Sequence, residues 1–341
     1  MDIYIPKFKD IFMTQSSGVG LTSRFKGEYR VELRGADGRI KYETDWKPNT
    51  LLNYGIWLLT YSSQSFNTFA DMVLGTGSTA VNITDINLSG TQLGEQNGVS
   101  SISGVNAGAP NYERITVRDY RFDPGRCTGT ITEFGLTNYG GDNPANLAVR
   151  VVLDVPIVKG ASDQLNIQHR LTWYPQLTDA TGVITIGGDV PEDYNYTMRH
   201  TMIGATPGIH PTSIAPHFWA SRYDLYISTA LSANTTNPQA AGVGSSMNGG
   251  YGASSISLSQ KAWDGTAGPY YCDATATWTV NAYGTGECNM LNFGMHCNQS
   301  WAANIGMQSR FTKVSDGSNL IKLNTHELKL TVRTYAERYV P

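Results

Sequence analysis

The chain has 341 residues, a formal net charge of −3 and only 16% charged residues, against about 25% in a typical globular protein. This balance argues against a nucleic-acid-binding protein, which would carry a basic stripe. The length suits one large or two ordinary domains. A neutral, polar, glycine- and tyrosine-rich surface is typical of β-rich extracellular or virion proteins, and of proteins that bury surface in an assembly.

Residues 1–27 are predicted to form an N-terminal arm, because polar and apolar residues mix there without a period. The first residues lack the continuous apolar run of a secretory signal. No run in the chain approaches the roughly 18 apolar residues of a membrane span, so we expect no such span.

Residues 28–180 are predicted to be a first β-sandwich module. It opens with a hairpin at 28–44, followed by a buried helix near 50–61 that Asn49 or Thr50 can cap. Gly55 costs that helix about 1 kcal/mol in propensity and indicates close packing. A strand at 71–74 ends in the turn 75–77. Residues 78–110 are then predicted to be a surface loop, and 112–122 a strand.

The clearest strand pattern lies in residues 131–174. Every odd residue from Val149 to Ile157 is apolar, and a second alternating run extends from Leu165 to Trp173. Period-two alternation indicates half-buried strands. Because Gly160, Ser162 and Asp163 separate the two runs, the sequence predicts an antiparallel hairpin.

The remainder is predicted to be a linker or crossing loop at 181–215 and a second β-sandwich module at 216–341, with strands at 222–229, 254–260 and 274–283 and a low-complexity loop at 231–253. Phe134-Gly135 is echoed by Phe293-Gly294, and His169 by His326. The predicted fold class is mainly β: two β-sandwich-like modules in tandem, with one short buried helix in the first. Two similar hairpins in one continuous sandwich would also explain the echo.

No motif for catalysis or cofactor binding is present: there is no HExxH, phosphate loop, GxSxG or CxxC. We therefore expect no cofactor, no metal and no enzymatic activity. Cys288, His296 and Cys297 could be imagined as zinc ligands, but their spacing is poor for tetrahedral coordination. We interpret these two cysteines, with Cys127 and Cys272, as free and mostly buried thiols of a protein made in a reducing cytosol.

Two other kinds of candidate residue have structural interpretations. His169 and His326 lie on apolar strand faces, which favours a core or interface position over a pH switch or ligand role. Glu133 and Asp154 could act as a glycosidase pair in a polysaccharide-degrading enzyme, but Glu133 is better explained as the partner of an arginine, Arg150 or Arg170.

An aromatic-rich segment is the candidate contact site for a glycan or receptor, because rings stack on sugars while nearby carboxylates and amides direct hydrogen bonds. The same residue types are also enriched in cores and oligomer interfaces, which is the favoured interpretation. The candidate residues are Trp263, Tyr270, Tyr271, Trp278 and Tyr283, near Asp264, Asp273 and Asn281.

The order of elements over residues 28–174 resembles the β-sandwich modules of tailed-bacteriophage tail and tail-fibre proteins. The elements are ELRGADGRIKYET, DWKPNTLLNYGIWLL, MVLGTGSTAVNITDINLSGTQL, the Glu-Phe-Gly-Leu run from Glu133 to Leu136, and LAVRVVLDVPIVKGASDQLNIQHRLTW. In those modules an asparagine segment after a hairpin opens a buried helix and a Gly-Thr-Gly turn follows. The final HELKLTVRTYAERY is similar to the strands that end such proteins.

The resemblance implies a non-enzymatic structural component of the virion, made in the bacterial host cytoplasm and located in the tail. Its partners would be other virion proteins and further copies of itself, contacted through loops 78–110 and 231–253 and through the N-terminal arm. One alternative is a tail protein that binds a host surface glycan or receptor. A second alternative is a capsid decoration protein.

Overall fold

The structure is a computed structural model. The residues that it describes are 10–12, 20–60, 69–98, 100–106, 113–137, 146–176, 178–186, 191–203, 225–228, 250–252, 255–265, 268–279, 287–290, 292–297, 304–318, 320–323 and 327–340.

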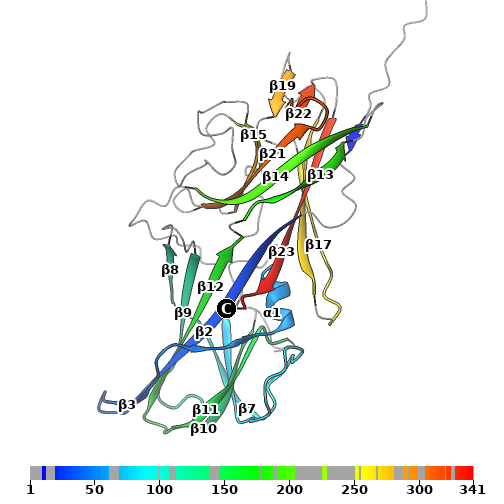
Figure 1. Cartoon of the computed structure of the whole chain (residues 1–341). Helices are drawn as coiled ribbons and strands as arrows, with labels where there is room; N and C mark the ends of the chain where they lie inside the picture. The colour runs from blue at the N-terminus through cyan, green and yellow to red at the C-terminus, as the bar shows by residue number, and fades with distance from the viewer. Residues whose placement is uncertain are drawn as a thin grey trace, which may run out of the picture.

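The fold is mainly β with one short helix, as the sequence predicts (Figure 1). The largest sheet has the strand order β17-β18-β23-β2-β12-β9-β8, with β1 pairing with β23 and β3 and β4 pairing with β2. Its strands are β1 Asp10–Phe12, β2 Gly20–Arg34, β3 Ile40–Glu43, β4 Lys47–Pro48, β8 Ser100–Asn106, β9 Glu113–Phe122, β12 Gln164–Pro175, β17 Ser255–Gln260, β18 Tyr270–Trp278 and β23 Glu327–Arg338.

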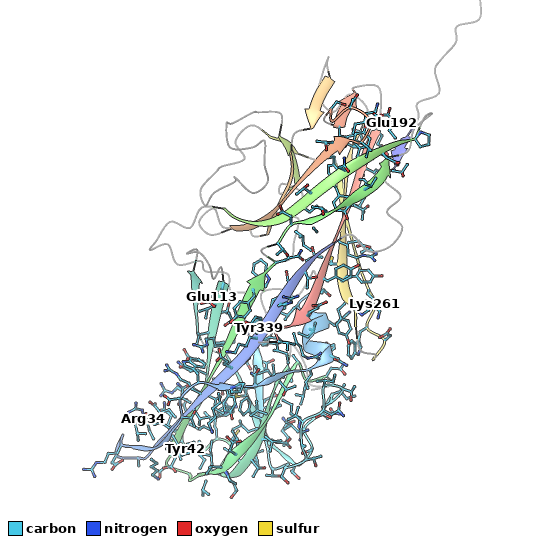
Figure 2. All side chains as sticks on the ribbon, in the orientation of Figure 1. Arg34, Tyr42, Glu113, Glu192, Lys261 and Tyr339 are labelled. Atoms are coloured by element: carbon cyan, nitrogen blue, oxygen red, sulfur yellow. The ribbon has the colours of Figure 1, made fainter. Side chains whose placement is uncertain are left out.

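A five-stranded sheet packs against the large one, and side chains fill the space between them (Figure 2). Its order is β5-β11-β10-β6-β7. Fully buried Phe25, Phe122 and Phe134 help to form the core that the two sheets share. The strands of this sheet are β5 Thr50–Leu51, β6 Asp71–Gly75, β7 Gln92–Asn97, β10 Gly129–Thr137 and β11 Val149–Lys159.

A six-stranded sheet of order β13-β14-β21-β20-β15-β16 lies at the other end of the molecule, with a small two-stranded sheet, β19-β22 (Figure 1). Strands β13 and β14 occupy much of the predicted linker 181–215, so that assignment is wrong for 181–186 and 192–203. The strands are β13 Ala180–Ile186, β14 Glu192–Ile203, β15 Leu225–Ser228, β16 Gly250–Gly252, β19 Glu287–Met290, β20 Asn292–Cys297, β21 Asn304–Lys313 and β22 Leu320–Leu323.

The predicted hairpin of 149–157 with 165–174 is wrong in its pairing, although both strands exist. Strand β11 pairs with β10 and β5, whereas β12 pairs with β2 and β9 in the opposite sheet. The turn between them, closed where the Gly160 amide donates to Asp163 Oδ2 at 2.9 Å, therefore crosses from one sheet to the other. Alternation specifies which face is buried but not which strand is the neighbour.

The last strand, β23, lies inside the large sheet, between β18 and β2. It runs parallel to β2, with Gly20 opposite Arg333 and Phe25 opposite Arg338. Residues 20–27 of the predicted arm therefore belong to β2. Tyr270 and Ala336 join the core formed by the first half of the chain. The division into two tandem modules stays a prediction, since this sheet takes strands from both sides of the proposed boundary.

Helix α1 spans Asn53–Leu58, shorter than the predicted 50–61. Neither Asn49 nor Thr50 caps it, because Thr50 pairs with β11 in strand β5. Instead, the Arg338 guanidinium donates to the Leu51 carbonyl and to Asn53 Oδ1, both at 2.6 Å. The C-terminal strand therefore holds the start of the helix. Close packing at Gly55 is confirmed, since a Cβ there would collide with the Ala148 carbonyl.

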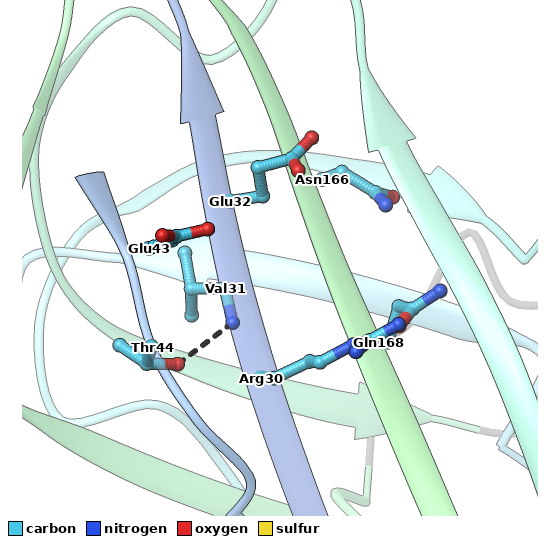
Figure 3. Close-up of a pocket in the computed structure, with 7 residues that line it drawn as sticks. All are labelled: Arg30, Val31, Glu32, Glu43, Thr44, Asn166 and Gln168. Atoms are coloured by element: carbon cyan, nitrogen blue, oxygen red, sulfur yellow. Dashed lines mark hydrogen bonds between the residues drawn. The ribbon is translucent and has the colours of Figure 1, made fainter. Parts of the chain in front are cut away.

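The outer face of β2 is polar. On β2, Val31 and Leu33 are buried in the core, while Arg30 and Glu32 point the other way. Together with residues from β12 and from the end of β3, these outward side chains line a groove (Figure 3).

Candidate functional site

Residues 76–91 connect β6 to β7 without a helix or strand. Irregular loops longer than about 12–15 residues are uncommon in compact domains, and they are usually either functional or linker segments. This loop covers the outer face of the five-stranded sheet, where Val81 and Leu88 pack against Leu52, Val73 and Leu147. It is therefore a packed layer of the protein. The remainder of the predicted surface loop 78–110 contains strands β7 and β8, so that prediction is wrong for 92–97 and 100–106.

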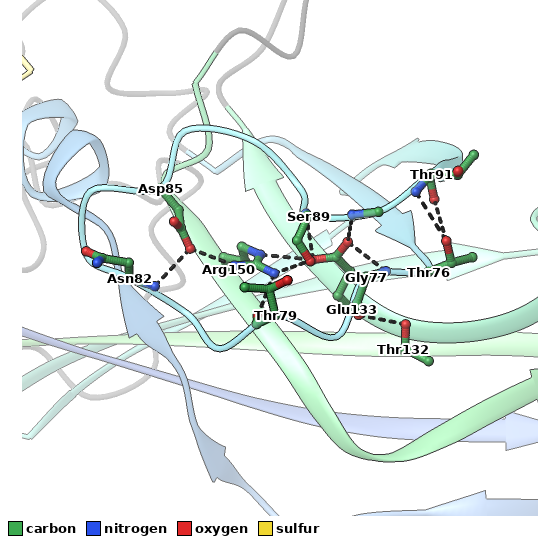
Figure 4. A network of polar contacts seen from close by, with 11 residues as sticks. Thr76, Gly77, Thr79, Asn82, Asp85, Ser89, Thr91, Thr132, Glu133 and Arg150 are labelled. Atoms are coloured by element: carbon green, nitrogen blue, oxygen red, sulfur yellow. Dashed lines mark hydrogen bonds and ion pairs between the residues drawn. The ribbon is translucent and has the colours of Figure 1, made fainter.

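Glu133 anchors this loop from beneath (Figure 4). Its neighbours Phe134 and Leu136 contribute to the core, and its own fully buried side chain accepts hydrogen bonds from the loop. Oε1 accepts from the backbone amides of Gly77 at 2.9 Å and Gly90 at 2.8 Å. Oε2 accepts from the backbone amide of Ser89 at 3.1 Å and from its hydroxyl at 3.2 Å.

Arg150 completes the network from the neighbouring strand β11. Its side chain is 2% exposed, and its Nε donates to Glu133 Oε2 at 2.9 Å. The other guanidinium nitrogens donate to Asp85 Oδ2 at 2.6 Å and to the Thr79 carbonyl at 2.8 Å. The sequence predicts an arginine, Arg150 or Arg170, as the partner of Glu133, and Arg150 is that partner. Arg170 pairs instead with Glu28, at 2.7 Å.

The electrostatics of Glu133 suit an anchoring anion. Burial by itself would raise the pKa of this carboxyl, but the Ser89 and Gly90 amides and the Arg150 guanidinium together hold it below its ordinary value. Hydrogen bonding to the charged form is the cause of such a depression. Asp154, the other carboxylate considered for a glycosidase pair, is ion-paired with Lys47 at 2.7 Å. Within the described part of the chain, no contact joins it to Glu133.

Sequence reasoning missed the loop residues that bind Glu133. Backbone amides donate most of these hydrogen bonds, and because every residue except proline has one, the residue types do not reveal them. The glycines are the signal that could have revealed these residues. Gly77 and Gly90 lie so close together that a Cβ on either would collide with the opposite end of the loop. The Gly-Thr-Gly run at 75–77 and the Ser-Gly pair at 89–90 therefore indicate that the two ends of this polar loop meet.

Two isoleucines on this anchored loop point to solvent. Ile83 is 41% and Ile86 43% exposed. Their backbones are fixed, since the Ile83 carbonyl accepts from the Asn53 amide at 2.8 Å and the Ile86 carbonyl from the Leu147 amide at 2.9 Å. Single exposed apolar side chains are ordinary. Here two lie three residues apart on a loop that is held rigidly from below.

The structure brings two of the five candidate aromatic residues together. The rings of Trp263 and Tyr270 lie 6.0 Å apart, and Trp263 also packs against Tyr54 and Trp57 of α1. Tyr270 is 3% exposed. The Trp57 indole donates to the backbone carbonyl of Lys261 at 2.8 Å, beside the helix (Figure 2). Trp263 and Tyr270 thus hold α1 against the large sheet.

The other three candidates are not part of that cluster. Tyr271 follows Tyr270 along β18 and faces the opposite way. It lies under the Arg333 guanidinium, 3.7 Å from its ring centroid, and beside Tyr335. Trp278 lies in β18 with its side chain outside the described residues, and Tyr283 lies outside them altogether. The glycan or receptor role of the five residues stays a prediction.

The cysteines and histidines are placed as follows. Cys272 is buried and free, with its pKa raised by burial to about 11, and Cys127 is half-buried and free. The side chains of Cys288, His296 and Cys297, and all of His326, lie outside the described residues. Across the described part of the chain, no three His, Cys, Asp or Glu side chains gather in a way that could hold a metal ion.

His169 lies in the core, 2% exposed, with its ring edge-on to Phe69 at 5.6 Å between centroids. Its Nε2 has no hydrogen-bond partner. Burial lowers the pKa of this imidazole to about 3, and the positive charge of Arg118 adds to the effect. His169 is therefore neutral at physiological pH.

Comparison of the chain with protein-family models, curated protein sequences and solved structures finds no match. In the described residues, no helix is long and apolar enough to span a membrane.

Proposed function

We propose that this protein is a non-enzymatic structural component of a bacteriophage virion, associated with the tail, that assembles into a symmetric oligomer. The observation that carries the proposal is the anchored loop 76–91. It is fixed by a buried carboxylate and a buried arginine, and it displays Ile83 and Ile86 to solvent. Association costs less ordering entropy when the contacting loop is already rigid.

The absence of catalysis is part of the proposal, and the state of the candidate groups supports it. Both oxygens of Glu133 are occupied by backbone amides and Arg150. The thiol of Cys272 is buried with a raised pKa, so it is a poor nucleophile. The assignment to a virion tail is supported by the resemblance of residues 28–174 to tail and tail-fibre modules.

The anchored loop suggests how copies would associate. An isoleucine side chain contributes about 1.5–3 kcal/mol when it is fully buried, so two such residues on a preformed surface can favour one specific contact. A repeated contact between identical copies closes into a ring when the rotation allows it. The contact would combine these isoleucines with the neutral polar surface of the sandwich.

The test is the mass of the full chain in solution, measured by size-exclusion chromatography with light scattering over a wide concentration range. We expect a closed oligomer that persists on dilution. The double variant Ile83→Ser/Ile86→Ser should dissociate, whereas Ile40→Ser, which changes an equally exposed isoleucine on β3, should not. A monomer at every concentration, or equal behaviour of the two variants, would contradict the loop contact. Antibody labelling of particles would separate a tail position from a capsid position.

A further inference from the structure

The outer face of the large sheet carries a groove of about 270 Å³. Its floor is formed by the neighbouring strands β2 and β12, and one wall by the end of β3 (Figure 3). Ligand sites built on strands are more precise than sites on loops. The lining residues are Arg30, Val31, Glu32, Glu43, Thr44, Asn166 and Gln168.

The polar side chains of the groove stand in two cross-strand rows. Glu43, Glu32 and Asn166 form one row, since Glu32 lies opposite both of the others in the sheet. Arg30 and Gln168 form the next row. Carboxylates accept hydrogen bonds, a guanidinium donates them, and amides do both. Acceptors and donors are therefore interleaved over a small area.

Some of these groups are held in place by the protein. The Arg34 guanidinium donates to both oxygens of Glu32, at 2.6 and 2.8 Å. Arg30 Nε donates to Gln168, whose amide in turn donates to Asp119. These contacts fix the orientation of the groove before any ligand arrives.

Two groups in the same groove have no such partner. Within the described residues, neither the Glu43 carboxylate nor the Asn166 side-chain amide makes a hydrogen bond to the protein. They lie on either side of Glu32 in the same row. The groove therefore combines residues that the protein holds in place with unused acceptors and donors on either side of Glu32.

Trp46 lies next to the groove, in contact with Arg30. Its ring covers the guanidinium groups of Arg30, at 5.0 Å, and Arg170, at 4.4 Å. Arg170 is itself held by Glu28. The half-buried indole is thus fixed by two cation–π contacts, one of them to a residue that lines the groove.

The chemistry of the lining selects the class of ligand. Among the residues that line the groove only Val31 is apolar, so the groove suits a polar ligand better than a hydrophobic one. Glu32 and Glu43 oppose a phosphate or another strong anion. Interleaved donors and acceptors suit the vicinal hydroxyls of a neutral sugar, and the volume lies just below the roughly 300–1,000 Å³ of sites for drug-sized ligands.

We propose that this groove binds one ring of a neutral saccharide, with Glu43, Asn166 and Arg30 bonding to its hydroxyls and Trp46 flanking it. The proposal does not depend on oligomer formation. It places saccharide recognition on the outer face of the large sheet, away from the aromatic segment predicted from the sequence. In a tail protein, such a site would contact surface glycan.

The experiment screens the full chain against an array of neutral oligosaccharides of glucose, galactose, mannose and N-acetylglucosamine. The best binder is then measured by isothermal titration calorimetry. We expect the variants Glu43→Gln and Asn166→Ala each to weaken binding at least tenfold. Arg24→Ala, which removes an exposed residue on the outer face of β2 beyond the groove, should leave binding unchanged. Circular dichroism and thermal unfolding confirm that each variant is folded.

Hydrogen exchange locates the bound sugar independently of the variants. The saccharide should protect the amides of residues 30–34, 43–46 and 164–168 more than those of the rest of the chain. If no neutral saccharide binds, or if binding is unchanged in Glu43→Gln and Asn166→Ala, the proposal is wrong. Calcium binding lost in Glu43→Gln, without saccharide binding, would equally overturn it and assign the groove to a cation.

Discussion

At the scale of single residues, one buried carboxylate organises a large irregular segment. Glu133 accepts bonds from both ends of loop 76–91, and Arg150 reaches its middle through Asp85 and Thr79. A charge buried without a partner is very costly, so the glutamate and the arginine each require the other. This explains how so polar a loop packs as a fixed layer on the sheet.

Replacing Glu133 by glutamine should therefore lower the free energy of unfolding by about 3–5 kcal/mol, because Arg150 loses its fully buried counter-charge and keeps only the partly exposed Asp85. Asp85→Asn is the matched control. It removes a more exposed partner of the same arginine, with 24% of its side chain accessible, and should cost about 0–1 kcal/mol. Urea denaturation measures both variants. Equal losses would mean that burial does not determine the strength of this network.

His169 predicts acid sensitivity. The folded pKa of about 3 lies below the ordinary value of 6.5. Between these two pH values the imidazole is protonated in the unfolded chain but neutral in the folded chain. The free energy of unfolding therefore falls as pH falls through this window. Protonation of this one group should lower the free energy of unfolding by about 2 kcal/mol between about pH 7 and about pH 5.

The variant His169→Leu should remove that contribution, and its stability should depend less on pH than that of the natural chain. Urea denaturation at both pH values provides the comparison. Identical pH dependence in the two proteins would show that the imidazole titrates normally in the folded state.

At the scale of elements, tertiary contacts decide the position and composition of the helix. Thr50 and Leu51 are taken up by strand pairing, so α1 begins only at Asn53. Arg338 from the end of the chain then bonds to the backbone and side chain at its start. Helix α1 packs tightly against its surroundings, with Trp263 on one side of it. The Ala148 carbonyl lies so close to position 55 that only a glycine fits there.

Gly55→Ala separates helix propensity from packing. Propensity alone predicts a gain of about 1 kcal/mol in stability. A methyl group at this position would meet the Ala148 carbonyl, which is backbone and cannot turn aside. We expect a net loss of about 1–3 kcal/mol in the free energy of unfolding, as for other overpacked sites. Increased stability in urea denaturation would show that the helix can shift away.

At the scale of the whole molecule, the large sheet ties the two ends of the chain together. Strand β23 lies between β2 and β18, and Tyr270 and Ala336 enter the core built by the first half of the sequence. We therefore expect residues 20–180 to be incomplete as a folding unit, because the part of β2 that pairs with β23 would be left open. Open strand edges promote aggregation.

A fragment of residues 20–180 tests this dependence. We expect it to aggregate or to unfold without a cooperative transition, whereas the full chain keeps a cooperative one. The readouts are light scattering and thermal unfolding followed by circular dichroism. A soluble fragment that unfolds as cooperatively as the full chain would favour two independent tandem modules.

The sequence by itself determined the fold class, most strand positions in the first half, the hairpin at 28–44 and the need of Glu133 for an arginine partner, while the structure decided between Arg150 and Arg170. These follow from local alternation, turn chemistry and the need of a buried charge for its opposite. Only the tertiary structure decided which strands are neighbours: β11 and β12 share a core but not a sheet, and β23 inserts beside β2. The physical reason is that alternation records burial of a side chain, whereas pairing is made by backbone groups that every residue carries.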